Sequence, residues 1–364
     1  MELEVDRGDL RHVRITDAGP GPLGPGEVRL RIDAFGLTSN NITYAVFGDA
    51  MGYWRFFPGP DQDGTHWGRL PVWGFAEVVE SSVAGVDEGA RLYGYLPLAD
   101  ELIVRPGRID GTGFSDLAPH RQPLPSVYNR YSSVDRDPVY RSGREPQQML
   151  LWPLFVTSFV VDDFLGDHGL FDSACVLISS ASAKTSIAAA FLLAGRPGIE
   201  VIGLTSTANL GFASSLDCYD RVLAYDQVRS LAPVDACYID VAGNQDVTAD
   251  IHRLLGGRLR YSMIVGDTHW ESPTASTGSL PGPRPTFLFA PDQIAKRRRE
   301  WGRDGFEQAV AGAWQRFSPW TDAWLDIRQV RGADAVESAY RELLEGRVDP
   351  RVGEVCSLRP PGAA

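Results

Sequence analysis

The chain of 364 residues lacks the patterns that announce metal or hydrolytic chemistry. Its four cysteines form no C-x-x-C pair and have no histidine at metal-ligand spacing, which argues against a structural zinc site. No G-x-S-x-G segment is present, which argues against an α/β-hydrolase, and no H-E-x-x-H segment supports metal hydrolysis. Two of the cysteines lie in strand-like runs, and we expect them to be small buried residues in a reducing compartment.

The sequence also lacks a long apolar run and an excess of positive charge. Nothing approaches about 20 uncharged apolar residues, so we expect no membrane span, and residues 1–6 are too acidic for a secretion signal. The formal net charge of −12 argues against broad contact with nucleic acid or anionic lipid. The one basic run, at 296–299, is followed by Glu300 and is expected to be the solvated face of a helix. These features predict a cytoplasmic protein whose partner is a small molecule.

Hydrophobic patterning divides the chain into two expected domains. The first 110 residues alternate apolar and polar side chains in strand-like runs, whereas residues 105–148 are polar with little periodicity and predict a long loop region. From about residue 150 the pattern changes to an apolar helix, followed by strands that alternate with helices, which is typical of a doubly wound parallel sheet. We expect this sheet in residues 151–319 and a β-rich domain in residues 1–150.

Glycine is missing from the turn between the first strand and the first helix of this pattern. Residues 178–186 read I-S-S-A-S-A-K-T-S, where a dinucleotide-binding turn has G-x-G-x-x-G. Serine and threonine hydroxyls can donate to phosphate oxygens beside the free N–H groups of the helix start, and a lysine can add positive charge. The expected pyrophosphate contacts are Ser180, Ser182, Lys184 and Thr185.

Two other interpretations of this turn remain open. The ending Ala183-Lys184-Thr185 is similar to the G-K-[ST] of a nucleotide triphosphatase loop, but Ala183 and Ile178 stand where that motif needs glycine. The second interpretation is that this strand–helix turn binds no ligand. The next strand favours a dinucleotide, and NADP over NAD, because it ends in Thr205, Ser206 and Thr207 with no carboxylate to hold a ribose 2′-hydroxyl.

Several segments together resemble the medium-chain dehydrogenase/reductase superfamily, in its zinc-free quinone-reductase and enoyl-reductase branch. They are GEVRLRIDAFGLTSNNITY at 26–44, ACYIDVAGN at 236–244 and DAVESAYRELLEGRVDPRVGEVCSL at 334–358. The resemblance implies an α/β fold and a homodimer. One domain is a GroES-like β-barrel in residues 1–150, to which residues 320–364 return, and the other is a Rossmann domain. The chain departs from the family in its glycine-free turn, in the Trp73-Gly74-Phe75 that replaces the zinc-binding G-H-E, and in an insert at 113–148. It therefore resembles a side branch described as a domain of unknown function.

The resemblance also implies roles for particular residues. Asn41 takes the position of an aspartate near the nicotinamide and the active-site water. The implied cofactor contacts beyond the turn are Thr157 at the nicotinamide carboxamide, Tyr225 on the adenosine side, Val241 and Gly243 at one strand end, Val265 with Gly266 at the next, and Phe289 near the nicotinamide.

Reduction of a conjugated bond needs a proton donor, and tyrosine suits that role. Enoyl reductases of the superfamily keep a tyrosine shortly after the segment that contains Asn41, and here Tyr44 and Tyr53 are both available. Each is also open to a packing role, as are Tyr128 and Tyr131 of the insert. His66 and His269 lie in expected loops.

The leading hypothesis is an NADPH-dependent, zinc-independent reductase of an activated C=C or C=O bond in a small or medium organic molecule. An NADP(H)-binding protein without hydride transfer is the first alternative. A redox-neutral lyase or isomerase on the same fold is the second.

Overall fold

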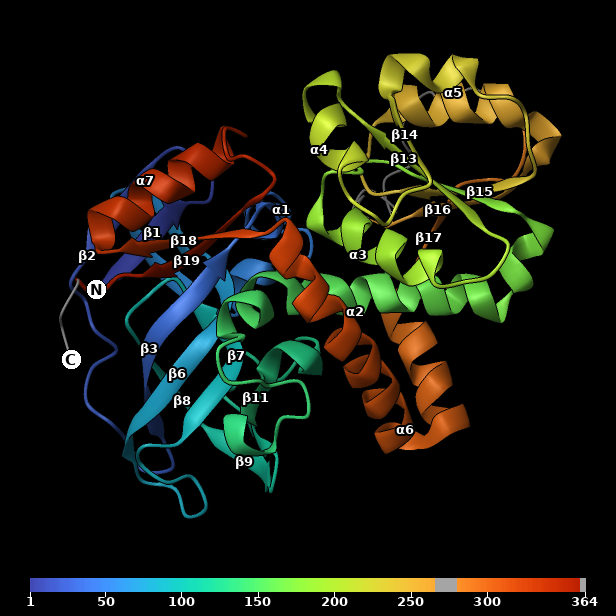
Figure 1. The fold of residues 1–364 in the computed structure, drawn as a ribbon. Helices are drawn as coiled ribbons and strands as arrows, with labels where there is room; N and C mark the ends of the chain where they lie inside the picture. Colours follow the sequence, from blue (N-terminus) through green and yellow to red (C-terminus); the bar gives the residue numbers. More distant parts are fainter. Residues whose placement is uncertain (266–279, 361–364) are drawn as a thin grey trace. The chain divides into compact units, whose positions relative to one another are not determined.

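The computed structural model describes residues 1–265 and 280–360 and leaves out the side chain of Pro291. The chain divides into two compact units (Figure 1). One unit consists of Met1–Leu150 and Leu325–Ala364, and the other of Leu151–Trp324.

The first unit is built from two mainly antiparallel sheets. Nine described strands form one sheet in the order β18-β19-β3-β6-β7-β11-β10-β9, with β8 also paired to β3, and four form a second sheet in the order β2-β1-β5-β4. Within the described residues, neither strand order closes into a ring. The strands up to β8 are β1 Glu2–Asp6, β2 Val13–Thr16, β3 Val28–Leu37, β4 Pro58–Gln62, β5 Thr65–Arg69, β6 Pro71–Ser81, β7 Arg91–Pro97 and β8 Glu101–Val104.

The expected alternation appears as burial in the central strand of this unit. Val28, Leu30 and Ile32 of β3 are buried, while Arg29 and Arg31 between them are partly exposed. Side chains of alternating residues point to opposite faces of a strand, so the apolar set forms one side of the core.

The C-terminal segment belongs to the first unit. Strands β18 (Asp326–Arg331) and β19 (Val352–Ser357) pair in parallel, and β19 pairs antiparallel with β3. Helix α7 (Ala333–Leu344) joins them and buries Val336, Ala339, Tyr340 and Leu343, the spacing of one helical face.

The expected loop at 105–148 is wrong. This segment contains β9 (Pro106–Asp110), β10 (Gly113–Asp116) and β11 (Arg130–Ser133), which extend the large sheet through pairing of β11 with β7. Strands of four or five residues are too short to show a period of two. A buried arginine, Arg121, which is 1% exposed, holds these short strands in place.

Arg121 uses its guanidinium to tie the segment together. It donates to Asp116 Oδ2 at 3.0 Å, to Tyr131 Oη at 2.9 Å and to the Tyr128 carbonyl at 2.6 Å. It also donates to Asn129 Oδ1 at 3.1 Å. A buried charge is tolerated when it is paired and its donors are satisfied, and this arrangement meets both conditions.

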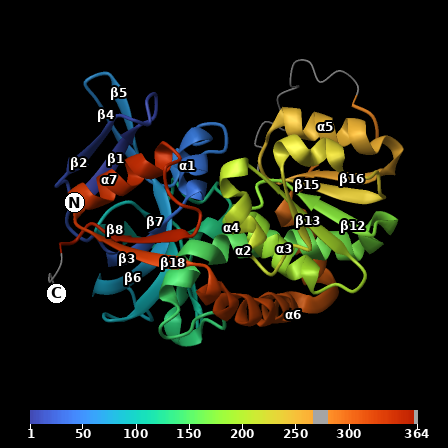
Figure 2. The same cartoon turned by 45° about the horizontal axis from the view of Figure 1, so that its top comes forward.

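The second unit is a doubly wound parallel sheet, as expected. Its six described strands run in the order β14-β13-β12-β15-β16-β17, and every neighbouring pair is parallel. This is the 3-2-1-4-5-6 order of a Rossmann sheet. Figures 1 and 2 show α5 on one face, and α2 with α3 on the other. The elements are β12 Cys175–Ile178, α3 Lys184–Ala194, β13 Glu200–Thr205, α4 Leu210–Ser214, β14 Arg221–Ala224, β15 Ala236–Asp240, α5 Gln245–Leu255, β16 Leu259–Ile264, β17 Thr286–Phe287 and α6 Ala290–Trp320.

One helix among the described residues, α2 (Glu145–Asp167), is a candidate membrane span. By length and composition it qualifies, but half of its apolar window is buried inside the structure, and buried core helices of soluble proteins pass the same test. Its second half also carries paired carboxylates: Asp162 accepts from Arg196 at 2.6 Å, and Asp163 from Arg297 at 2.8 Å. These contacts are those of a helix packed within protein.

A buried histidine makes the stability of the fold depend on pH. His252 in α5 is fully buried, with Nδ1 2.9 Å from the Pro281 carbonyl and Nε2 3.0 Å from Ser262 Oγ. Burial lowers its pKa below the usual 6.5, although the Pro281 carbonyl acts in the opposite direction. Between pH 6.5 and this lowered pKa, the unfolded chain therefore binds a proton that the folded chain does not.

We therefore expect the free energy of unfolding to fall as the pH drops below 6.5, and His252→Gln to flatten this dependence. One such group contributes at most about 1.4 kcal/mol per pH unit. Urea titrations at several pH values measure the slope. Parallel curves for the variant and the wild type would show that His252 does not titrate differently on folding.

Candidate functional site

The turn between β12 and α3 takes a left-handed residue in place of glycine. Ser180 has φ +51°, a conformation that is uncommon for residues with a side chain. Ala183 follows as the N-cap of α3 and makes no side-chain cap hydrogen bond. Since alanine has no oxygen to offer, the N–H groups of the first turn have no such partner in the cap residue. The turn thus presents an uncapped helix N-terminus at the carboxyl end of β12.

The turn compensates for its missing glycines by a glycine on the neighbouring strand. A Cβ atom at Gly203 of β13 would lie 2.8 Å from Ala181 Cβ and 3.0 Å from Cδ1 of Tyr219. Tyr219 also donates from its hydroxyl to the Ala181 carbonyl at 2.9 Å. The close approach of turn and sheet therefore depends on Gly203, which the sequence offered no local signal to single out.

Two hydroxyls of the turn are turned inward. Ser179 Oγ donates to Asp240 Oδ1 at 2.9 Å and accepts from the N–H groups of Val241 at 2.9 Å and Ala242 at 3.0 Å. Ser186 Oγ donates to the Ser179 carbonyl at 2.9 Å. Both serines are fully buried, so they join β12, β15 and α3 and are not placed to donate to a ligand.

The expected ribose-phosphate residues lie where β13 ends. Thr205 is buried, and its hydroxyl donates to Ser182 Oγ at 3.4 Å. The same oxygen of Ser182 accepts from Asn209 Nδ2 at 3.1 Å. Ser206 is partly exposed and Thr207 is exposed, so these two present the available hydroxyls at this strand end.

Tyr225, the expected adenosine-side contact, reaches back to the turn. It is partly exposed, and its hydroxyl accepts from the Ser180 N–H at 3.0 Å. The structure therefore brings Tyr225 and Ser180 together and satisfies one of the backbone donors of the turn from within the protein.

Thr157 lies one residue from a contact between α2 and α3. The Ser158 hydroxyl donates to the Thr185 carbonyl at 2.8 Å, while Thr157 Oγ1 donates to the Pro153 carbonyl of its own helix at 3.4 Å. Lys184 and Thr185 open α3, and both are partly exposed. This places the Thr157 turn of α2 beside the start of α3.

The remaining expected cofactor contacts follow other strands of the same sheet edge. Val241 follows β15, and Val265 follows β16 and donates from its N–H to the Asp240 carbonyl at 2.8 Å. Gly243 has φ +64° and donates to Asp240 Oδ1 at 3.0 Å. Phe289 is 53% exposed at the start of α6. Gly266 lies outside the described residues.

Asn41 of α1 (Ser39–Val46) is occupied by structural hydrogen bonds. Its Oδ1 accepts from the N–H of Thr38 at 2.7 Å in a capping box, and its Nδ2 donates to the Pro71 carbonyl at 2.9 Å. The side chain is 3% exposed and fastens α1 to β6.

Tyr44 and Tyr53 belong to an aromatic cluster in the first unit. We define this cluster as Tyr44, Tyr53, Trp73, Tyr95 and Tyr128. The Tyr44 and Tyr53 rings are 4.6 Å apart, the Tyr95 and Tyr128 rings 4.8 Å, and the Trp73 and Tyr95 rings 5.0 Å. The sequence pointed to Tyr44, Tyr53 and Tyr128 but not to Tyr95, which lies in the middle of β7 like an ordinary core residue.

Members of the cluster differ in exposure. Tyr44 is 5% exposed and Tyr95 is fully buried, while Tyr53 and Tyr128 are partly exposed. Burial raises the pKa of all four phenols. Tyr131 lies outside the cluster and is fully buried, and its hydroxyl donates to the Tyr95 carbonyl at 2.8 Å. The four phenols of the cluster are therefore neutral acids at ordinary pH.

Other candidates have ordinary surroundings. His66 is exposed, with Nδ1 2.7 Å from Asp61 Oδ1, and His269 lies outside the described residues. All four cysteines are buried, and burial raises the pKa of Cys175 to about 12. Across residues 1–265 and 280–360, no three His, Cys, Asp or Glu side chains are grouped to hold a metal ion.

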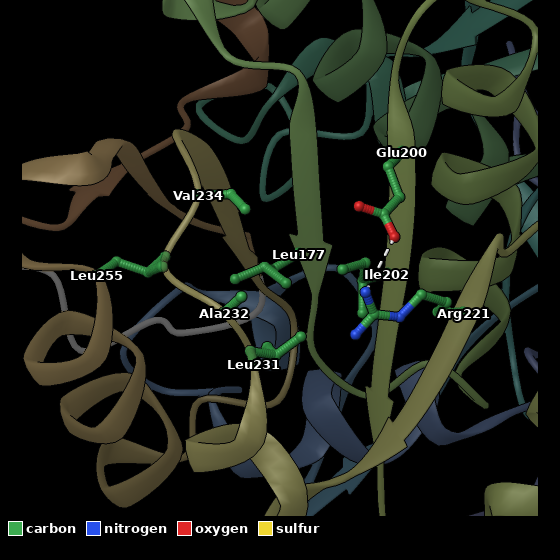
Figure 3. A pocket seen from close by; sticks show the side chains of 8 residues that line it. All are labelled: Leu177, Glu200, Ile202, Arg221, Leu231, Ala232, Val234 and Leu255. Carbon is green, nitrogen blue, oxygen red and sulfur yellow. Dashed lines mark hydrogen bonds and ion pairs between the residues drawn. The ribbon is translucent and has the colours of Figure 1, made fainter.

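A hollow in the second unit is too small for an organic substrate. Figure 3 shows it between Leu177, Leu231 and Leu255, with an ion pair of Glu200 and Arg221 at its rim. Its volume of about 40 Å³ is little more than that of one water molecule. Glu200 and Arg221 begin β13 and β14, so their pair lies at the amino ends of these strands, away from the carboxyl edge.

Comparison with protein families gives one family whose model matches most of the chain. The family described as "Protein of unknown function (DUF2855)" matches residues 35–349. The chain belongs to this family. Its place in a family of unknown function is as expected, and no curated protein matches.

Solved structures with the same fold include one that is described as an oxidoreductase. CurA from Vibrio vulnificus, in complex with NADPH, is 13% identical with a TM-score of 0.58, covering 96% of this chain and 95% of that one. The yhdH oxidoreductase from Salmonella enterica, in complex with NADP, is 14% identical with a TM-score of 0.53, covering 98% and 99%. The Etr1p/NADP/crotonyl-CoA complex is 10% identical with a TM-score of 0.57, covering 98% of each chain. The expected α/β fold with a Rossmann sheet is thereby confirmed.

The packing of the turn against β13 predicts a reciprocal pair of substitutions. Gly203→Ala should lower the free energy of unfolding by about 1–3 kcal/mol, because the added methyl group meets Ala181 and Tyr219. The double variant Ala181→Gly/Gly203→Ala should recover part of the loss, because the two methyl groups no longer compete. Chemical denaturation of the four proteins measures the coupling, and strict additivity would contradict the close approach.

Proposed function

We propose that the chain is a zinc-independent, NADP(H)-dependent reductase of an activated C=C or C=O bond. One observation carries the proposal: helix α3 begins just after β12, the strand about which the order of the parallel sheet reverses, and its N-cap Ala183 provides no side-chain cap. Ligands of open α/β sheets bind at this point, and an anionic group is favoured at such a helix start. A diphosphate is the ligand that both conditions favour.

The residues of the turn fit a dinucleotide through backbone donors more than through side chains. The first turn of α3, opened by Lys184 and Thr185, supplies N–H groups and a positive charge for the pyrophosphate. At the end of β13, Ser206 and Thr207 leave room for a 2′-phosphate, since no carboxylate stands there. Bound NADPH would supply the hydride.

The proteins of similar fold support this reaction class. Three of them are described with NADPH or NADP, and one of these also with crotonyl-CoA, a conjugated thioester. A small or medium organic molecule with an activated double bond, such as an acyl thioester, is the substrate class that we propose. The tyrosines of the aromatic cluster are the proposed source of the proton.

A second candidate is a protein that binds NADP(H) without hydride transfer. The hydrogen bond from the Ser180 N–H to the Tyr225 hydroxyl favours it, because that donor is already satisfied, as do the inward hydroxyls of Ser179 and Ser186. A redox-neutral lyase or isomerase step would use the same cofactor edge and would yield a product without net reduction.

Cofactor binding and turnover separate these functions. We expect purified protein to enhance the fluorescence of NADPH on binding, and to oxidise NADPH in the presence of at least one member of a panel of enones, quinones and enoyl thioesters. Binding without oxidation of NADPH would support the second candidate if the acceptors are recovered unchanged, and the redox-neutral step if an acceptor is converted. The absence of any fluorescence change would contradict both the reductase and the binding protein.

Cofactor preference should respond to charge at the end of β13. Ser206→Asp is expected to weaken NADPH binding at least tenfold, about 1.4 kcal/mol, because a carboxylate repels the 2′-phosphate, and to weaken NADH binding much less. Ser206→Asn is the matched control, being nearly the same size without the charge. Fluorescence titration gives both constants. Equal losses for the two nucleotides would argue against a 2′-phosphate at Ser206.

A further inference from the structure

We infer that the hydroxyl of Tyr225 is a tether that holds the glycine-free turn in the conformation required to bind a dinucleotide. The tether is the hydrogen bond that the Ser180 N–H donates to Tyr225 Oη at 3.0 Å. Its importance for the cofactor rests on the proposed function, whereas the tether itself is a property of the protein alone. Tyr225 is thereby a positioning residue, in place of the adenosine contact that the resemblance implies.

The backbone at Ser180 adopts a conformation that its own side chain disfavours. Its φ of +51° lies in the left-handed region, which glycine occupies freely. For a residue with a Cβ atom, the preference against this region is about 5- to 30-fold. The sequence of the turn therefore does not select the left-handed conformer, and an interaction from outside the turn has to do so.

The tether acts directly at the left-handed residue. The other peptide groups of the turn have different partners: the Ser180 carbonyl accepts from the Ala183 N–H at 2.7 Å, and the Ala181 N–H donates to the Leu204 carbonyl of β13 at 2.9 Å. The Ser180 N–H has its partner in Tyr225. Because φ describes the rotation of the bond next to this N–H, a fixed acceptor for it favours one value of φ.

Tyr225 is itself placed by contacts that do not involve the turn. It follows β14 and begins the short 3₁₀ turn η6 (Tyr225–Ser230). The Ala224 N–H donates to Gln227 Oε1 at 3.0 Å and fixes the start of η6. The Tyr225 side chain packs against the buried apolar cluster that includes Val228 and Leu231. The tether therefore joins the turn after β12 to a strand two places away in the sheet order.

The conformation of Ser180 matters for a ligand because the turn leads into α3. Lys184 begins this helix, and the N–H groups of its first turn are the proposed donors to the pyrophosphate. An apparent dissociation constant rises in inverse proportion to the fraction of molecules in the binding-competent conformation. Without the tether, the left-handed conformer of Ser180 becomes the minor one, and affinity falls with its population.

Hydrogen exchange tests the tether in the protein without cofactor. In protein labelled with nitrogen-15 at serine, the signal of the Ser180 amide is identified by its absence from Ser180→Gly. Tyr225→Phe should accelerate the exchange of this amide about tenfold or more, because the hydrogen bond that protects it is removed. Protected serine amides elsewhere in the sheet should keep their rates. An unchanged rate for Ser180 in Tyr225→Phe overturns the tether.

Fluorescence titration with NADPH tests the positioning role. Tyr225→Phe should raise the dissociation constant about tenfold. In a Ser180→Gly background the same substitution should raise it by less than about twofold, because glycine reaches the left-handed conformation without help. This rescue by glycine separates positioning of the turn from a general loss of structure. Tyr261→Phe is the matched control, since it removes a hydroxyl from β16 of the same sheet and should leave the dissociation constant unchanged.

The remaining outcomes contradict the inference, and they are distinct from failure of the proposed function. An equal loss of affinity in both backgrounds would assign Tyr225 to direct contact with the nucleotide. Tighter binding by Tyr225→Phe would show that its hydroxyl competes with the cofactor for the Ser180 N–H, and an unchanged constant would remove the positioning role. If the wild type binds no NADPH, the proposed function fails, while the exchange rate at Ser180 still decides the tether. Urea denaturation of each variant identifies any that is not folded.

Discussion

The carboxyl edge of the parallel sheet depends on the hydroxyl of Ser179. It lies between the ends of β12 and β15, where the strand order reverses, and satisfies the backbone N–H groups of Val241 and Ala242. It also donates to Asp240, whose carboxylate accepts from Gly243 and Thr248. Buried backbone donors without partners are costly, so a glycine at 179 would leave this junction open. The Ser179 side chain therefore has a structural role at this sheet edge.

The turn therefore divides its residues between holding the sheet and facing a ligand. The hydroxyls of Ser179 and Ser186 form hydrogen bonds within the protein, and Ala181 packs against Gly203. What remains for an anion is the backbone at the start of α3, where the N–H groups and the helix dipole act whatever the side chains are. A glycine-free sequence is compatible with phosphate binding on this argument, because the donors that matter belong to the main chain. The side-chain hydroxyls contribute less than the sequence alone suggested.

The second unit was readable from the sequence because its signals are local. Helix α3 begins at Lys184 and ends at Ala194 as its apolar pattern predicts, and strand–helix alternation implies the parallel sheet. Sequence reasoning failed where structure depends on contacts between residues that are far apart in the chain. Residues 105–148 were expected to be a loop, because a buried Arg121 that organises short strands leaves no periodic trace. Gly203 and Tyr95 were missed for the same reason: each looks like an ordinary strand residue until its neighbour is known.

The hydroxyl groups of the aromatic cluster cost folding free energy that a cluster serving only for packing would avoid. Phenylalanine would fill the same space, yet four of its five rings carry hydroxyls, and Tyr95 Oη finds no hydrogen-bond partner among the described residues. A buried hydroxyl left unsatisfied costs about 1–3 kcal/mol, a large share of the stability of a typical domain. Such a cost is more readily understood where the hydroxyls take part in chemistry than where they only pack. The hydroxyls of the cluster are therefore not explained by packing alone, and Tyr128 brings the 113–148 segment into contact with the cluster through the Tyr95 ring.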